Sequence, residues 1–117
     1  MKSAMILRIE GIMALVLSVY FYFVILQFSW IVFVIFLLAP DLSMIGYLKN
    51  NKVGSVWYNL FHTYSIPMLI IICSVLMDSH ILLMISLIWV AHIGMDRMFG
   101  YGLKYPTKFQ DTHLDRL

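Results

Sequence analysis

The sequence predicts an all-α membrane protein, a bundle of four transmembrane helices, and three observations predict it. Hydrophobic residues make up 62% of the 117 residues and charged residues only 12%, whereas a soluble domain has roughly 45–50% and 25%. The apolar residues form runs that are long enough to cross a bilayer. The basic residues lie only at alternate ends of these runs. This composition excludes a soluble enzyme, and the net charge of +2 is too small to indicate a nucleic-acid partner.

The first apolar run, residues 9–39, is too long for one crossing. As a single helix it would measure roughly 46 Å, whereas the hydrocarbon core is about 30 Å thick. We expect a break just before Ser29, whose hydroxyl can cap the next helix. The first two spans are therefore predicted at about 4–26 and 29–48.

The rest of the chain gives two more spans and a polar tail. The third span is predicted at about 53–77 and the fourth at about 79–99. Glycine and proline interrupt any helix in the tail, residues 100–117. The whole chain is therefore predicted to form a single membrane domain.

The basic residues predict the orientation of the bundle. With four spans all of them fall on one side of the membrane: Lys2, Arg8, Lys49, Lys52, Arg97, Lys104, Lys108 and Arg116. Because cytoplasmic loops carry an excess of lysine and arginine, that side and both termini are predicted to be cytoplasmic.

Ionisable side chains within the spans are the candidates for function. Each costs at least about 2.5–3.5 kcal/mol in hydrocarbon, so such residues usually have a role. They lie roughly 12–18 Å along a helix from the flanking lysines, in the cytoplasmic half of the membrane. They are Glu10, Asp41, His62, His92 and Asp96, with Asn59 as a neutral companion.

Four of these residues predict a metal site. His92 and Asp96 are four residues apart and share a helix face. Pro40 loosens the backbone beside Asp41, and His62 lies on a polar stripe of the third span. Carboxylates and imidazoles from three helices suit Zn²⁺, Mn²⁺ or Fe²⁺. Such an ion acidifies a bound water, which then attacks an ester or a phosphate.

Two further polar residues in the spans have less definite roles. Asn59 is expected to orient a ligand of this cofactor site. Glu10 is expected either to contribute to the site or to form an ion pair with Arg97 or Arg8.

The tail supplies candidates for a catalytic base, Asp111 and His113. Alternate positions of an extended segment face the same way. The tail is therefore expected to fold back over the cytoplasmic mouth and donate a ligand or a base. The alternative is a solvated chain end.

Several blocks of the sequence resemble a family of bacterial membrane proteins known as domain of unknown function 4260. The blocks cover nearly the whole chain: residues 39–47, 58–64, 89–97, 100–106 and 111–114. The resemblance implies a small protein of the bacterial inner (plasma) membrane.

A fainter resemblance is to the predicted membrane-bound metal-dependent hydrolases of the YdjM type. It is carried by Pro40-Asp41, by His62 and by His92-Ile93-Gly94-Met95-Asp96, with Gly100 and Pro106 after them. It implies that Asp41, His62, His92 and Asp96 are metal ligands.

The residues leave three functional hypotheses open. The first is a metal-dependent hydrolase that acts on a lipid or another amphipathic substrate at the inner leaflet. The second is a non-enzymatic protein, an assembly partner, a small transporter or a homo-oligomer, whose polar residues form hydrogen bonds between helices. The third is a haem or quinone protein, with His62 and His92 as the axial haem ligands.

Overall fold

A computed structural model describes residues 3–106, 110 and 112–116. The described part contains four helical spans, at 3–25, 30–48, 51–76 and 80–98, and each is long and apolar enough to cross a membrane. This confirms the prediction of an all-α protein with four transmembrane helices.

Three of the four spans are not simple α-helices. The first is α1 (Ser3–Tyr20), which ends in a π-helical turn, η1 (Phe21–Ile25). The second is α2 (Trp30–Phe36) followed by a 3-10 helix, η2 (Ala39–Leu48). The third is divided into α3 (Asn51–Phe61) and α4 (Ser65–Leu76). Only the fourth, α5 (His80–Met98), is an uninterrupted α-helix.

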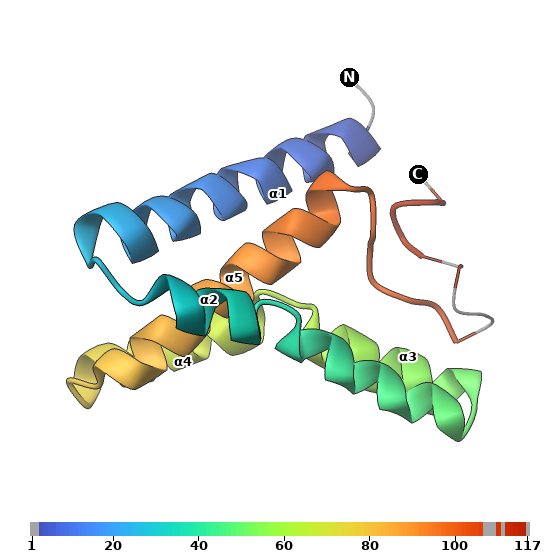
Figure 1. Cartoon of the computed structure of the whole chain (residues 1–117). Coiled ribbons are helices and arrows are strands. Elements are labelled where there is room, and N and C mark those ends of the chain that lie inside the picture. The colour runs from blue at the N-terminus through green and yellow to red at the C-terminus, as the bar shows by residue number, and fades with distance from the viewer. Residues whose placement is uncertain (1–2, 107–109, 111, 117) are drawn as a thin grey trace.

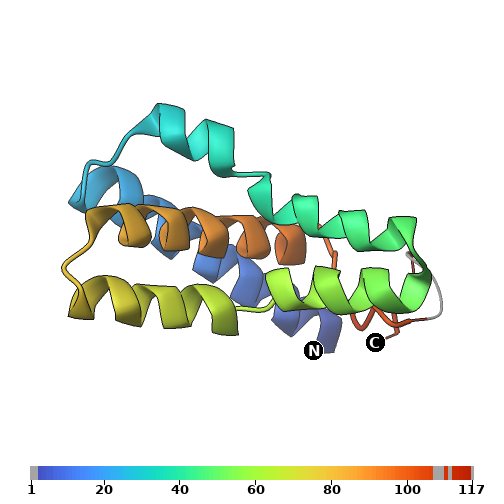
Figure 2. The ribbon, with the colours of Figure 1, turned by 90° about the horizontal axis from the view of Figure 1, so that it is seen from below.

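The fourth span is the centre of the bundle. Figure 2 shows α5 between the second span on one side and α4 on the other, with α1 behind it. In α5, ten of the 19 residues are buried, whereas in each other span only 11–17% of the apolar 18-residue stretch is buried. The exposed faces of those spans are strongly apolar, as expected of surfaces in contact with lipid.

Helix α1 crosses α5 in close contact at two glycines. A Cβ atom added at Gly94 would lie 2.6 Å from the backbone oxygen of Gly11, and one added at Gly11 would collide with the Cβ of Arg97. Small residues let the backbones of membrane helices approach in this way. These glycines therefore set the distance between the two helices.

Polar side chains cap the helices at the turns. The hydroxyl of Ser29 accepts a hydrogen bond from the backbone N–H of Val32, which is the capping role expected from the sequence. Ser79 caps α5 in the same way, and the side chain of Asn50 caps α3. Two of these turns lie at one end of the bundle, and the third lies at the other end with the start of α1 and the tail (Figure 2).

The hairpin of η2 and α3 projects beyond the end of α5 (Figure 1). The tail that follows α5 folds back against this hairpin instead of extending into solvent. It pairs with itself through an antiparallel bridge between Lys104 and Thr112. The backbone N–H of His113 also donates to the carbonyl of Leu103 at 2.9 Å. The tail thus covers the end of the bundle where α5 stops.

The third span differs from the expected continuous helix. The sequence places Pro67 inside this span, and a proline is tolerated in the first turn of a helix because the N–H it lacks has no partner there. Pro67 occupies such a position near the start of α4, and the helix is interrupted before it, at residues 62–64. The interruption leaves backbone carbonyls at the end of α3 without helical partners.

Candidate metal centre

The structure brings together the four residues predicted as metal ligands. Asp41 comes from the first turn of η2, His62 from the end of α3, and His92 and Asp96 from α5. One ligand atom from each residue lies within 4.8 Å of the others. These residues are called the Asp-His cluster below.

The distances within the Asp-His cluster are short and similar. Oδ1 of Asp41 lies 3.1 Å from Nε2 of His62 and 3.2 Å from Nε2 of His92. Oδ2 of Asp96 lies 3.5 Å and 3.2 Å from the same two nitrogens. The two Nε2 atoms are 3.1 Å apart. All four side chains therefore point at one spot.

The cluster is buried and has one partly open side. Both imidazoles are fully buried, and the side chain of Asp96 is 11% exposed. The side chain of Asp41 is 33% exposed, so it is the most accessible of the four. Two carboxylates at this depth are costly unless a positive charge compensates them.

Hydrogen bonding indicates which nitrogen of His62 carries the proton. Its Nδ1 lies 2.8 Å from the backbone oxygen of Tyr58. A carbonyl oxygen can only accept, so Nδ1–H donates and Nε2 of neutral His62 carries a lone pair. That lone pair faces a carboxylate oxygen and a second imidazole nitrogen. This is the arrangement of metal-ligating histidines, whose other ring nitrogen donates to a carbonyl.

The geometry of the cluster fits a small divalent cation. Ligand bonds of about 2.0–2.1 Å in a tetrahedron place the ligand atoms about 3.3 Å from one another. Five contacts of 3.1–3.5 Å in the Asp-His cluster agree with this spacing. Two imidazoles and two carboxylates also form a donor set that suits Zn²⁺, Mn²⁺ or Fe²⁺.

The same geometry contradicts the haem hypothesis. Two axial histidines bind from opposite sides of the iron, with the porphyrin between them. The Nε2 atoms of His62 and His92 are only 3.1 Å apart, and carboxylate oxygens lie beside both. No porphyrin fits between the two rings.

Side chains of α5 stabilise the interruption that positions His62. The indole N–H of Trp89 donates to the backbone oxygen of Phe61 at 2.7 Å. The buried guanidinium of Arg97 donates to the backbone oxygens of His62 and Tyr101, each at 3.0 Å. The bonds to Phe61 and His62 satisfy carbonyls that the interrupted helix leaves free, as membrane burial requires, and the bond to Tyr101 joins Arg97 to the tail.

The sequence reasoning missed this role of Trp89 and Arg97. Arg97 was expected only as one of two alternative ion-pair partners of Glu10, and its fork of N–H groups instead joins the end of α3 to the tail. A detectable signal was present for Trp89, which lies three residues before His92 and so shares its face of α5.

Lys104 was also missed, and it lies beside the cluster. Its ammonium stands 4.8 Å above the ring of Tyr58. That ring in turn stacks on the imidazole of His62, with centroids 3.8 Å apart. Burial lowers the pKa of Lys104, while the carboxylates of Asp115 and Asp96 act in the opposite direction.

Asn59 does not contact the Asp-His cluster as the sequence reasoning expected. Its side-chain N–H donates to the backbone oxygen of Lys104 at 2.7 Å, and its side-chain oxygen accepts from the backbone N–H of Lys104. Both ends of the amide are therefore used to hold the tail. Asn59 positions Lys104 instead of a metal ligand.

Glu10 is not brought to the cluster either. It lies on an exposed part of α1, and among the described residues it forms no ion pair with Arg8 or Arg97. Arg8 instead packs against Gly100, whose φ of +89° marks the turn after α5. Packing of α1 against α5 places Glu10 on the outside.

Of the two residues predicted as catalytic bases, the structure describes His113, whereas Asp111 lies outside the described residues. His113 is half-buried, and its Nδ1 accepts a hydrogen bond of 2.7 Å from the backbone N–H of Leu103. Its ring packs against Gly102, where a side chain would collide with it. In the structure His113 therefore holds the fold of the tail.

The docking of the tail is expected to weaken in acid. Burial and the nearby Arg97 lower the pKa of His113. A released tail then binds more protons than the docked tail as the pH falls below about 6.5, and docking loses free energy. Hydrogen exchange of the amides of residues 100–105, corrected for intrinsic rates, should rise below that pH.

Two variants control this measurement. Gln at position 113 can still accept the N–H of Leu103 but does not titrate, so His113→Gln should remove the pH dependence. Substitution of the exposed His80, at the other end of the bundle, should leave it unchanged. Equal exchange at neutral and acidic pH in the unaltered chain would contradict the role of His113.

The comparison with known families assigns the chain. The sequence profile described as Domain of unknown function (DUF4260) matches residues 4–117. The chain belongs to the DUF4260 family. No curated protein and no solved structure matches it. In this DUF4260 protein the match contains all four residues of the Asp-His cluster, together with Asn59, Trp89, Arg97 and Lys104.

Proposed function

We propose that this protein is a divalent-metal-dependent hydrolase that cleaves an ester in a lipid-type, amphipathic substrate within the membrane. The convergence of four buried ligand atoms at 3.1–3.5 Å carries the proposal. The fixed proton on Nδ1 of His62 supports it, because it leaves Nε2 as a lone-pair donor.

In this proposal Asp41, His62, His92 and Asp96 hold the metal. When bound, the ion supplies a Lewis acid and acidifies water at neutral pH. Hydrolysis consumes one water: its oxygen bonds to the ester carbon or phosphorus, the bond to the leaving alcohol breaks, and a proton passes to that alcohol. Asp41 is the most exposed of the four cluster residues. We therefore assign to its carboxylate the first acceptance of the proton that the attacking water releases.

We also propose that the end of the bundle with the tail faces the cytoplasm. The described basic residues that flank the spans lie at this end, and positive residues favour the cytoplasmic side. The substrate would then enter from the inner leaflet.

Metal content tests the proposal directly. Full-length protein purified in detergent without a histidine tag should contain about one divalent ion per chain. His92→Ala should reduce this content to background, because only three ligand atoms remain. His80→Ala is the matched control, since His80 is exposed on the same helix far from the cluster, and it should keep the ion.

Hydrolysis provides the second readout. Ester and phosphoester lipids in mixed micelles should be cleaved by the metal-loaded protein and by His80→Ala, and not by His92→Ala. Protein that carries no metal, or a His92→Ala variant that keeps both metal and activity, would overturn the proposal.

A further inference from the structure

Two cavities flank the Asp-His cluster on opposite sides. The first, about 280 Å³, is polar. Its lining consists of Asp41, Met44, Tyr58, Asp96, Tyr101 and Lys104. It contains both carboxylates of the cluster, and a residue of the tail, Lys104, closes it. This cavity lies at the end of the bundle where the tail packs, since Tyr101 and Lys104 belong to the tail.

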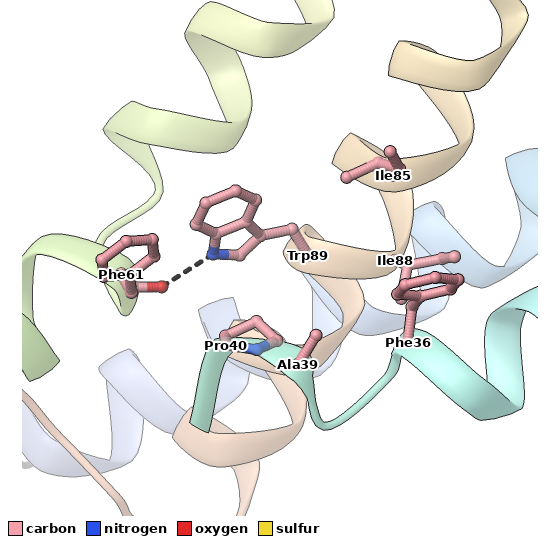
Figure 3. Close-up of a pocket in the computed structure, with 7 residues that line it drawn as sticks. All are labelled: Phe36, Ala39, Pro40, Phe61, Ile85, Ile88 and Trp89. Carbon is pink, nitrogen blue, oxygen red and sulfur yellow. Dashed lines mark hydrogen bonds between the residues drawn. The ribbon is translucent and has the colours of Figure 1, made fainter. Parts of the chain in front are cut away.

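The second cavity is apolar and has a volume of about 190 Å³. Figure 3 shows the indole of Trp89 on one side of it, with Pro40 and Phe36 among the facing residues. The indole N–H of Trp89 is used by the backbone oxygen of Phe61, so the ring presents only apolar surface. An apolar cavity of about 150 Å³ can hold a benzene molecule, so this one holds several methylene groups.

Along the chain, these features follow the same order in η2 and in α5. In η2, Pro40 lines the apolar cavity, Asp41 belongs to the cluster, and Met44 lines the polar cavity. In α5, Trp89 lines the apolar cavity, His92 belongs to the cluster, and Asp96, also of the cluster, lines the polar cavity. Helix α3 runs in the opposite direction, and there Tyr58 of the polar cavity precedes Phe61 of the apolar cavity, with His62 directly after it. The cluster therefore lies between an apolar space deeper in the bundle and a polar space nearer its end.

This order matches the orientation of a lipid in one leaflet, with its chain inside and its head group at the surface. The charge of the site favours an anionic head group. A divalent ion balances the carboxylates of Asp41 and Asp96, and the ammonium of Lys104 adds one positive charge. Lysine is a common partner of phosphate oxygens.

We propose that the substrate is a phosphate-bearing lipid whose head group contacts Lys104 in the polar cavity and whose alkyl chain occupies the apolar cavity beside Trp89. This inference rests on the proposed function, because the metal provides the charge balance. Asn59 contributes by holding the backbone of Lys104 through two hydrogen bonds.

Quenching of Trp89 fluorescence tests the proposal without measuring activity. Trp30→Phe and Trp57→Phe remove the two tryptophans on exposed surfaces and leave Trp89 as the probe. Metal-loaded protein is placed in phosphatidylcholine nanodiscs that contain a small fraction of lipid with brominated chains. Brominated phosphatidic acid should quench Trp89 more strongly than brominated phosphatidylcholine at the same fraction.

Two pairs of variants locate the head group and the chain. Lys104→Gln should lower the affinity for phosphatidic acid about tenfold or more, whereas Lys49→Gln, at the exposed loop of the same end, should not. Ala39→Leu fills the apolar cavity and should reduce quenching. Val34→Leu, which adds the same kind of volume on the exposed face of α2, should not change it.

The outcomes separate this inference from the proposed function. If metal-loaded protein is quenched equally by both lipids, the inference is wrong and the proposed function is unaffected. If the protein binds no metal and shows no preference between the lipids, the proposed function itself is wrong. Inorganic phosphate at the concentration of the lipid should not relieve the quenching. Full relief would show that free phosphate is the ligand and would overturn the assignment of a lipid.

Discussion

Gly94→Leu is expected to separate α1 from α5 and to lower the free energy of unfolding by about 3 kcal/mol or more. Even a single Cβ at position 94 would lie 2.6 Å from the oxygen of Gly11 and 2.8 Å from the nitrogen of Leu15. Both neighbours are backbone atoms, so neither can rotate away. The whole of α1 has to move.

Unfolding of the purified protein by titration with a denaturing detergent measures this effect. Gly94→Ala should cause a smaller loss, since only one carbon has to be accommodated. Val16→Leu adds volume on an exposed face of α1 and should leave the midpoint unchanged. If Gly94→Leu had the same midpoint as Val16→Leu, the close crossing of α1 and α5 would be wrong.

Arg97→Met is expected to destabilise the protein and to abolish binding of the divalent ion proposed for the Asp-His cluster. The substitution leaves the carbonyls of His62 and Tyr101 without the donors they have now. The carbonyl of His62 is buried, and a buried carbonyl left unsatisfied costs about 1–3 kcal/mol. The backbone at the end of α3 then relaxes, and the ring of His62 moves with it.

Arg97→Lys distinguishes the contribution of the positive charge at position 97 from that of the fork of N–H groups. Lysine keeps the positive charge but has no rigid fork of N–H groups to span two carbonyls. We expect a partial loss of stability and of metal content, both measured on the same preparation. Full retention of both properties in Arg97→Met would show that Arg97 does not support the interruption of the third span.

The membrane class and the cluster followed from local patterns. Long apolar runs have to form helices in a bilayer, because no water satisfies their backbone groups. Ionisable residues inside such helices cost free energy, so they usually have a role. Because His92 and Asp96 share a helix face at any packing, their proximity needed no tertiary information. Asp41 and His62 were matched to them through depth, which is fixed by their distance along the chain from the flanking lysines.

The support around the cluster did not follow from local patterns. Arg97 was one of two alternative ion-pair partners expected for Glu10, but its guanidinium donates to the carbonyl of His62 at the interruption of residues 62–64 and to the carbonyl of Tyr101 in the tail. An interruption has no charge pattern of its own, and Pro67 does not mark its position, because this proline fits the first turn of α4. Asn59 was expected to orient a metal ligand, and its actual partner, the backbone of Lys104, could not be found from local spacing because it lies 45 residues away.

The sequence by itself determined that this chain crosses a membrane four times and carries two acids and two imidazoles at matched depth. Those properties depend on hydropathy and on spacing along a single helix. Only the tertiary structure decided that the tail folds back to bring Lys104 to the cluster, and that cavities of opposite polarity flank it. Such features arise from contacts between distant segments, whose free energies depend on shape and packing rather than on any local pattern.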